Sequence, residues 1–322
     1  MPFPNRFLVP FLASLAFLGA SHAEYPDKPI RLVVPFAPGG STDLIARLVA
    51  EPLRQVLGQV VIVDNRGGAG GMIGTAEVAR AAPDGYTLGV GTVSTMVVYP
   101  ATQSKPSYTA ENFVAVTNIA VMPNVIAVNP AFPARNLKEF IAVLKANPGK
   151  YSFATSGIGS INHLMGESFQ AGAGVKLNHV PYKGSGPAMQ DVIGGQVDIL
   201  IDQLPSSKAF IDAGKLRLIG VISPGRAREY PEVMTMVEAG LTGFNDQAWY
   251  GLIAPARTPP AVIAKLTAAM QKVMAMPEVR ARLEKVGATP LGSSSAEYTA
   301  QVHTEIEKMK KLVKARNITL EE

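Results

Sequence analysis

Short apolar runs alternate with amphipathic helical patterns along almost the whole chain, and this alternation restricts the fold more than any other feature. The pattern predicts strands at Ile30–Pro35, Val60–Asp64, Tyr86–Val90, Phe113–Ala120, Val125–Val128, Tyr151–Ala154, Leu177–Val180, Val197–Asp202, Leu216–Ile222 and Tyr250–Ile253. It predicts helices at Leu44–Leu57, Ile73–Ala81, Leu137–Ala146, Ile161–Gln170, Ala188–Ile193, Ala209–Asp212, Pro260–Met274, Pro277–Val286 and Ala296–Ala315. Strands separated by crossover helices are typical of parallel α/β sheets, which bind ligands outside the carboxyl ends of their strands.

The first 23 residues have the three parts of a secretory signal peptide. A basic start with Arg6 precedes the apolar run Leu8–Gly19, and Ser21-His22-Ala23 supplies the small residues of a cleavage site before Glu24. The apolar run is short for a bilayer-spanning helix, so an N-terminal membrane anchor is the weaker alternative. We therefore expect residues 1–23 to be cleaved and the rest of the chain to be exported.

The composition excludes several classes of protein. A chain of 322 residues exceeds one ordinary core and predicts about two domains. It has no cysteine, which excludes disulfides, thiolate metal sites and a cysteine nucleophile. The formal net charge is +5, but the basic residues are dispersed and lack an aromatic stacking pattern, so we expect no binding to nucleic acid.

Two loops rich in glycine and hydroxyl side chains each follow a predicted strand and precede a predicted helix. The first is Pro35–Asp43 and the second is Thr155–Ser160. The free N–H groups and the positive dipole end at the start of a helix favour an anion. The first loop contains neither Lys nor Arg, so backbone and hydroxyl groups would hold that anion. Because the loops are far apart in sequence, we expect two domains that face each other across a cleft, each binding one end of a small acid.

Two short segments are candidates for the crossings between these domains. They are Met122-Pro123-Asn124 and Ser223-Pro224-Gly225. Together they predict a discontinuous first domain, residues 24–123 plus 224–322, and a second domain, residues 124–223.

Glycine at a strand-to-helix turn often marks only a tight connection, and this is the alternative interpretation of both loops. A third glycine run, Arg66–Gly71, resembles a dinucleotide-binding motif. It follows the second strand rather than the first, and no acidic residue ends a strand at the required spacing. We interpret it as a close-packed turn at the cleft or the hinge.

Catalytic motifs are scarce. Gly-x-Ser-x-Gly, Gly-x-x-x-x-Gly-Lys and His-Glu-x-x-His are all absent, and no cluster of ligands has metal spacing. An exported serine hydrolase that uses Ser160 and His163 is one alternative, but no third group accompanies this pair. A capping or ligand-orienting role for His163 is the stronger interpretation. We therefore expect no enzyme activity, no cofactor and no metal.

Three other polar residues have both a structural and a functional interpretation. Asp202 ends an apolar strand, where it either caps the next helix toward Ser206 or accepts a hydrogen bond from a ligand. Tyr182 is a candidate for the wall of the pocket. Lys183 either supplies a positive charge there or forms an exposed salt bridge, which is commoner for lysine.

Longer motifs carry a resemblance to a known family. They are Tyr25–Arg31, Val34–Asp43, Val63–Gly71, Pro83–Leu88, Tyr151–Ser160, Val180–Gly184 and Trp249–Pro255. In this order they resemble the periplasmic solute receptors of tripartite tricarboxylate transporters, also called the Bordetella uptake gene family. The resemblance covers essentially the whole chain after residue 23. Gly91-Thr92-Val93-Ser94 departs from the commoner pattern, which has a glycine late in that loop.

The resemblance implies an α/β fold with two lobes, a type II-like Venus flytrap of two parallel or mixed sheets flanked by helices. It implies a periplasmic, non-enzymatic receptor that closes by a hinge on a small organic carboxylate and delivers it to a tripartite tricarboxylate-type transporter. The partners would be the carboxylate and the integral-membrane subunits of the transporter, and we expect the receptor to be a monomer. A ligand receptor for a sensor kinase needs the same closure and is a further alternative.

The same resemblance implies the residues of the site. The wall of the first lobe and its water anchors correspond to Phe36, Ala37, Gly40, Ser41 and Thr42. The second lobe would bind through Thr155, Ser156, Gly157 and Ser160, with Tyr182, Lys183 and Asp202 at the edge of the pocket. In this family, backbone N–H groups, hydroxyls and bridging waters hold the carboxylate, in agreement with a first loop that has no Lys or Arg.

Overall fold

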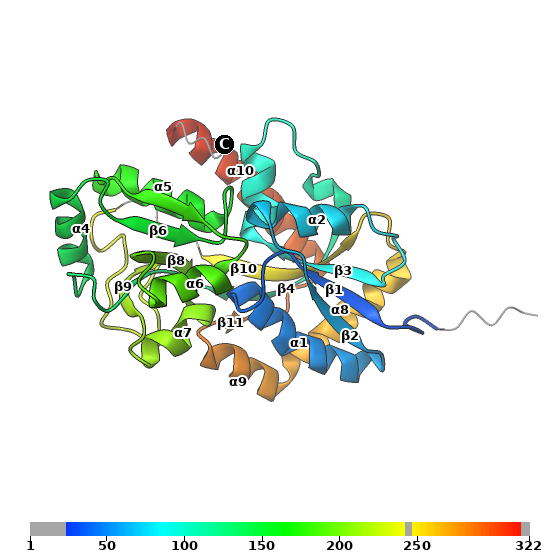
Figure 1. Ribbon diagram of the computed structural model, residues 1–322. Coiled ribbons are helices and arrows are strands. Elements are labelled where there is room, and N and C mark those ends of the chain that lie inside the picture. The colour runs from blue at the N-terminus through cyan, green and yellow to red at the C-terminus, as the bar shows by residue number, and fades with distance from the viewer. Residues whose placement is uncertain (1–23, 242–246, 317–322) are drawn as a thin grey trace, which may run out of the picture.

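The computed structural model describes residues 24–241 and 247–316, and the predicted signal peptide lies outside them. Within these residues the strands form two sheets, one of six strands and one of five, which lie side by side with helices around them (Figure 1). The first sheet contains β1 (Ile30–Val34), β2 (Val61–Asn65), β3 (Thr87–Thr92), β4 (Phe113–Met122), β10 (Ala248–Pro255) and β11 (Thr289–Pro290), in the order β11-β4-β10-β3-β1-β2. The second contains β5 (Asn124–Val128), β6 (Ser152–Thr155), β7 (Asn178–Pro181), β8 (Ile199–Gln203) and β9 (Arg217–Ile222), in the order β7-β6-β8-β5-β9.

Each sheet is accompanied by its own helices. Those of the first sheet are α1 (Ser41–Leu57), α2 (Met72–Ala79), α3 (Tyr99–Thr102), α8 (Pro260–Ala275), α9 (Pro277–Lys285) and α10 (Ser295–Arg316). Those of the second are α4 (Leu137–Ala146), α5 (Ile161–Ala173), α6 (Ser185–Ile193) and α7 (Leu204–Asp212). In the described part of the chain, no helix combines the length and the apolar character that a membrane crossing requires.

The chain passes between the sheets at two places. The strands of the second sheet all lie between residues 124 and 222, whereas the first sheet takes its strands from residues 30–122 and 248–290. The first crossing is at Pro123, and the second lies between β9 and β10. We therefore propose two domains, residues 24–123 plus 224–322 and residues 124–223.

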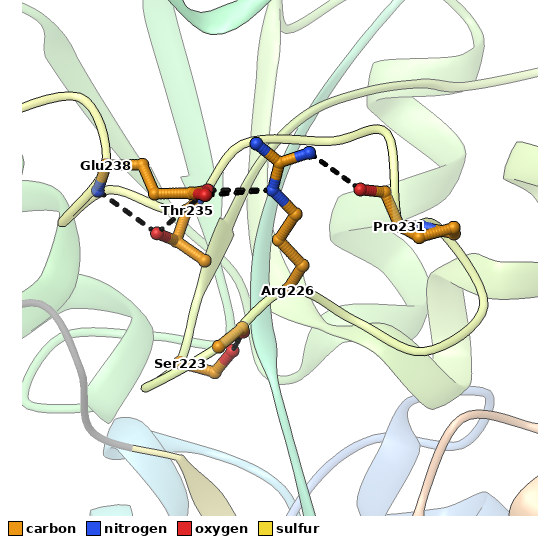
Figure 2. Close-up of polar contacts among 6 residues, drawn as sticks. Ser223, Arg226, Pro231, Thr235 and Glu238 are labelled. Atoms are coloured by element: carbon orange, nitrogen blue, oxygen red, sulfur yellow. Dashed lines mark hydrogen bonds and ion pairs between the residues drawn. The ribbon is translucent and has the colours of Figure 1, made fainter.

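The loop that leaves β9 toward the second crossing is held in shape by polar contacts (Figure 2). Arg226 Nε donates to both carboxylate oxygens of Glu238 at 3.0 Å, and its Nη1 donates to the Pro231 carbonyl at 2.7 Å. Glu238 also accepts from the Thr235 backbone N–H at 2.8 Å, and its own N–H donates to Thr235 Oγ1. These bonds fold residues 223–238 back on themselves before the chain returns to the first sheet.

Apolar faces pack the helices onto the sheets. On α1, Ile45, Val49 and Leu53 recur at helical spacing and are fully buried against the first sheet. On the other side of that sheet, α10 places the Tyr298 ring directly on Gly251. A Cβ at Gly251 would lie 2.3 Å from this ring, so only glycine permits the close approach.

The predicted strands are all present, with ends shifted by a few residues, and each predicted helix has a counterpart. Both sheets are mixed, one of the two possibilities that the resemblance implied, because β10 runs antiparallel to β3 and β4, and β5 runs antiparallel to β8 and β9. These strands are the ones next to the crossings, where no crossover helix intervenes. The pattern also places the starts of α1, α6 and α7 too late, because their first turns are rich in Ser, Thr, Gly and Pro and carry no apolar period.

Candidate ligand-binding site

A small cavity lies between the two sheets, where residues of both meet. It is lined by Phe36, Gly40, Ser41, Thr42, Thr92, Val93, Ser94, Ser156, Ile161, Asn162, Ser185, Gln203, Ala248 and Tyr250. Among these described lining residues none is charged, and the polar side chains all carry a hydroxyl or an amide. The cavity measures about 10 Å³, which is room for about one water molecule. The two walls therefore lie closed on one another, and a larger solute enters only when they separate.

The first wall is the loop that joins β1 to α1. Gly40 is the N-cap of α1 and has extended backbone, which points the first turn of the helix at the cavity. The loop is fixed from behind by Asp43, whose carboxylate accepts from the Gly39 N–H at 3.1 Å and from Asn65 Nδ2 at 3.0 Å. Asn65 Nδ2 also donates to the Phe36 carbonyl at 3.0 Å. The acidic side chain nearest this helix start thus braces the loop and does not line the cavity.

The second wall is the start of α5. Ser160 is its N-cap, and its hydroxyl accepts from the His163 N–H at 3.2 Å. The Ile161 N–H at the first position of the helix donates to Ser94 Oγ at 3.0 Å. Because Ser94 follows β3 of the first sheet, this bond joins the start of α5 directly to the first lobe. The starts of α1 and α5 consequently border the same cavity from opposite sheets.

A buried serine cluster surrounds Asp202 behind the cavity. Ser185 Oγ donates to one carboxylate oxygen at 2.6 Å, and the hydroxyls of Ser206 and Ser207 donate to the other. Ser206 Oγ lies 2.7 Å from Ser41 Oγ, so the cluster reaches the first turn of α1. Burial raises the pKa of Asp202, while these hydrogen bonds act in the opposite direction.

A hydrogen-bonded network of amide and hydroxyl side chains borders the cavity. The Tyr250 hydroxyl donates to Gln203 Oε1 at 3.1 Å. Gln203 Nε2 donates to Asn124 Oδ1 at 3.2 Å and to Asn162 Oδ1 at 3.3 Å. Ser156 Oγ gives Asn162 Oδ1 a second hydrogen bond at 2.7 Å. This network extends from β10 in the first sheet to α5 beside the second. It includes Asn124 at the start of β5, next to the first crossing.

Main-chain contacts hold the two lobes together around the cavity, and we call this line of contacts the seam. The Ala37 N–H donates to the Lys183 carbonyl at 3.0 Å. A Cβ added at Gly186 would lie 2.1 Å from the Pro38 carbonyl oxygen, and one added at Gly70 would lie 2.3 Å from the Ile158 carbonyl oxygen. The glycine run Arg66–Gly71 thus lies at the cleft, as predicted, and packs against the second loop.

The structure divides the predicted site residues into three groups. Those that line the cavity are Phe36, Gly40, Ser41, Thr42 and Ser156. Those that line an open groove outside the seam are Ala37, Gly157, Tyr182 and Lys183. Those that lie behind the walls are Thr155, Ser160 and Asp202: Thr155 Oγ1 lies 2.7 Å from His179 Nε2, Ser160 caps α5, and Asp202 holds the serine cluster.

The predicted site residues omit several lining residues, namely Ile161, Asn162, Ser185, Gln203, Ala248 and Tyr250. They also omit Thr92, Val93 and Ser94, which belong to the loop that departs from the family pattern. Some of them stand one or two places beyond a predicted motif, as Asn162 does after Ser160 and Gln203 does after Asp202. Tyr250 lies in an apolar strand, where a buried aromatic residue is indistinguishable from ordinary core.

The His163 side chain makes packing and backbone contacts and does not form a catalytic pair with Ser160. Its ring stacks on His179 with centroids 4.1 Å apart, and its Nδ1 accepts from the Gly159 N–H at 3.3 Å. Burial lowers the pKa of both histidines to about 4. Ser160 Oγ is bound to the backbone N–H of His163, so the hydroxyl–imidazole contact of the hydrolase alternative is not made.

Comparison with known proteins identifies the family. Residues 45–318 match the family model described as "Tripartite tricarboxylate transporter family receptor". The chain belongs to this family. Its members are periplasmic solute receptors, as the motifs predicted.

Solved structures agree with this assignment over nearly the whole chain. Periplasmic binding protein BugD is 37% identical, with a TM-score of 0.88 over 92% of this chain and 99% of that one. Rpa4515 of R. palustris with adipate is 32% identical, with a TM-score of 0.87 over 92% and 99%. MatC (Rpa3494) from Rhodopseudomonas palustris with bound malate is 34% identical, with a TM-score of 0.85 over 90% and 100%. The predicted two-lobed fold of mixed sheets flanked by helices is confirmed.

Proposed function

We propose that this chain is a periplasmic receptor that closes its two lobes on one small organic carboxylate and delivers it to the membrane subunits of a tripartite tricarboxylate transporter. The observation that carries the proposal is the uncharged cavity between the starts of α1 and α5. Helix starts supply N–H donors and a positive potential, which suit an anion without a fixed cation beside it. The family match and the malate- and adipate-bound relatives support the same class of solute.

Binding is coupled to opening and closing of the lobes. The closed cavity has room for about one water molecule, so a carboxylate enters an open form and the lobes then close around it. We propose that the receptor performs no chemistry on its solute. The mature protein would begin at Glu24 after cleavage of residues 1–23, and it would act as a monomer.

Isothermal titration calorimetry on the chain from Glu24 tests this function. Malate and adipate serve as the first probes, and we expect binding at one site per chain with no product detectable by NMR. Gly40→Val should abolish the heat signal. A Cβ at Gly40 already lies 3.3 Å from Ser185 Cβ, so the larger side chain would fill the space between the walls.

Gly225→Val is the matched control, because a Cβ at Gly225 meets nothing within 4 Å. It should bind like the wild type. The proposal is wrong if a broad panel of carboxylates gives no binding to the wild type, or if Gly40→Val folds and retains full affinity.

A further inference from the structure

One polar atom at the cavity has no partner in the described part of the structure, namely Asn162 Nδ2. Asn162 is the second residue of α5, lines the cavity and is 1% exposed. A buried amide N–H group without an acceptor is unfavourable, because it has lost its water and gained nothing in exchange. This atom can therefore donate to an acceptor that enters the cavity, such as an oxygen of a water molecule or of a solute.

The orientation of the amide is determined by its neighbours. Asn162 Oδ1 accepts from Ser156 Oγ and from Gln203 Nε2. Gln203 is held in the same orientation by two further bonds, because its Nε2 donates to Asn124 Oδ1 and its Oε1 accepts from the Tyr250 hydroxyl. Reversing the Asn162 amide would set an N–H group against the Gln203 Nε2 donor, whereas the Ser156 hydroxyl can both donate and accept. The network thus directs Nδ2 away from Ser156 and Gln203.

The cavity contains no counter-charge for a cation. None of its described lining residues is acidic, and the Asp202 carboxylate behind it already accepts hydrogen bonds from Ser185, Ser206 and Ser207. An ammonium group enclosed here would lose its hydration without an ion pair to replace it. An oxygen of a carboxylate, carbonyl or hydroxyl group would instead complete the bond from Asn162.

We propose that Asn162 Nδ2 donates a hydrogen bond to an oxygen of the bound acid at the position where an amino acid carries its ammonium group. Asn162 thereby selects oxo and hydroxy acids over amino acids, because two donors would face each other there. The inference rests on the proposed carboxylate-binding function and names the class of solute within it. Asn162 is a specificity-determining residue, while Ser156 and Gln203 position it.

Matched pairs of solutes test the selection by calorimetry. Malate and aspartate have the same length and differ at one carbon, which carries a hydroxyl in the first and an ammonium in the second. Adipate and 2-aminoadipate give a second comparison in a longer chain, in which a hydrogen stands in place of the ammonium. We expect the wild type to bind the member without an amine about 10- to 100-fold more tightly.

Asn162→Asp keeps the shape of the side chain and replaces the free donor by a carboxylate oxygen. We expect this variant to lose at least about tenfold in affinity for malate or adipate and to lose or reverse the preference against the amine. Asn162→Ala should weaken binding of the amine-free member without this reversal. Asn112→Asp is the control, because it adds the same charge at an exposed position whose Oδ1 acceptor is kept.

The outcomes separate the two proposals. Equal binding of both members of each pair by the wild type would overturn the selection by Asn162 and leave the carboxylate receptor intact. Unchanged affinities in Asn162→Asp and Asn162→Ala, each shown by thermal unfolding to be folded, would also overturn it. Absence of binding to every carboxylate would overturn the proposed function itself.

Discussion

Gly186→Ala tests whether closure of the seam is necessary for binding. Gly186 is the second residue of α6 and has no left-handed backbone conformation, so alanine suits its own helix. Its added Cβ would nevertheless lie 2.1 Å from the Pro38 carbonyl oxygen, which belongs to the loop before α1. The conflict exists only while the lobes are closed, so the open protein should fold normally.

The size of the effect follows from the geometry. Real Cβ atoms essentially never approach another heavy atom closer than 3.0 Å, so the walls must part by at least about 0.9 Å at this point. The Ala37–Lys183 hydrogen bond at 3.0 Å and the Ser41–Ser206 bond at 2.7 Å would both be lost by a displacement of that size. At about 0.5–1.5 kcal/mol each, their loss costs about 1–3 kcal/mol of closure, or a 5- to 150-fold weaker affinity.

Calorimetry with malate and adipate measures the affinity, and small-angle X-ray scattering measures whether the ligand still closes the lobes. Gln190→Ala is the control, because it lies on the same helix with an exposed side chain. Wild-type affinity together with ligand-induced compaction in Gly186→Ala would refute the argument that main-chain contact across the seam controls closure.

Two further predictions concern stability. Burial lowers the pKa of His163 and His179 from 6.5 to about 4, so the unfolded chain binds more protons than the folded one between these values. The free energy of unfolding should therefore fall as the pH is lowered from about 6.5 toward 4, by up to about 1.4 kcal/mol per pH unit for each histidine. Urea unfolding at several pH values measures this change. A free energy of unfolding that does not vary over this pH range would contradict the lowered pKa of the two histidines. Asp202→Asn should reduce the free energy of unfolding by about 1–3 kcal/mol, because the amide leaves at least one of three buried serine donors without an acceptor. Urea unfolding of this variant at neutral pH provides the measurement, and an unchanged midpoint would exclude a structural role for the serine cluster.

Local patterns predicted the elements of the fold because each strand and helix carries its own apolar period. Ile45, Val49 and Leu53 define α1 without reference to the rest of the chain. The direction of β5 and β10 was not predictable in this way, since it depends on where the chain crosses between sheets. The π-helix Ser94–Val98 was missed because it is buried on all sides and has no polar face to give a period.

The candidate site was predictable to the extent that it consists of helix starts. Gly40, Ser41 and Thr42 belong to a loop whose composition already indicates backbone donors. Gln203 and Tyr250 meet only through the packing of strands from different sheets, and no local pattern joins them. The displacement of Lys183 to the outer groove follows from its carbonyl, which bonds to Ala37 across the seam, while its side chain remains exposed.

The contact between Gly186 and Pro38 joins backbone to backbone, and its shape does not depend on which side chains surround it. In a receptor that closes in this way, the residues that recognise the solute can be substituted while the backbone contact between the lobes stays the same. Substitutions at Asn162 or Phe36 would then change what is carried without disturbing how the two halves meet. One set of residues would then determine which solute is bound, and a different set would determine how the lobes close.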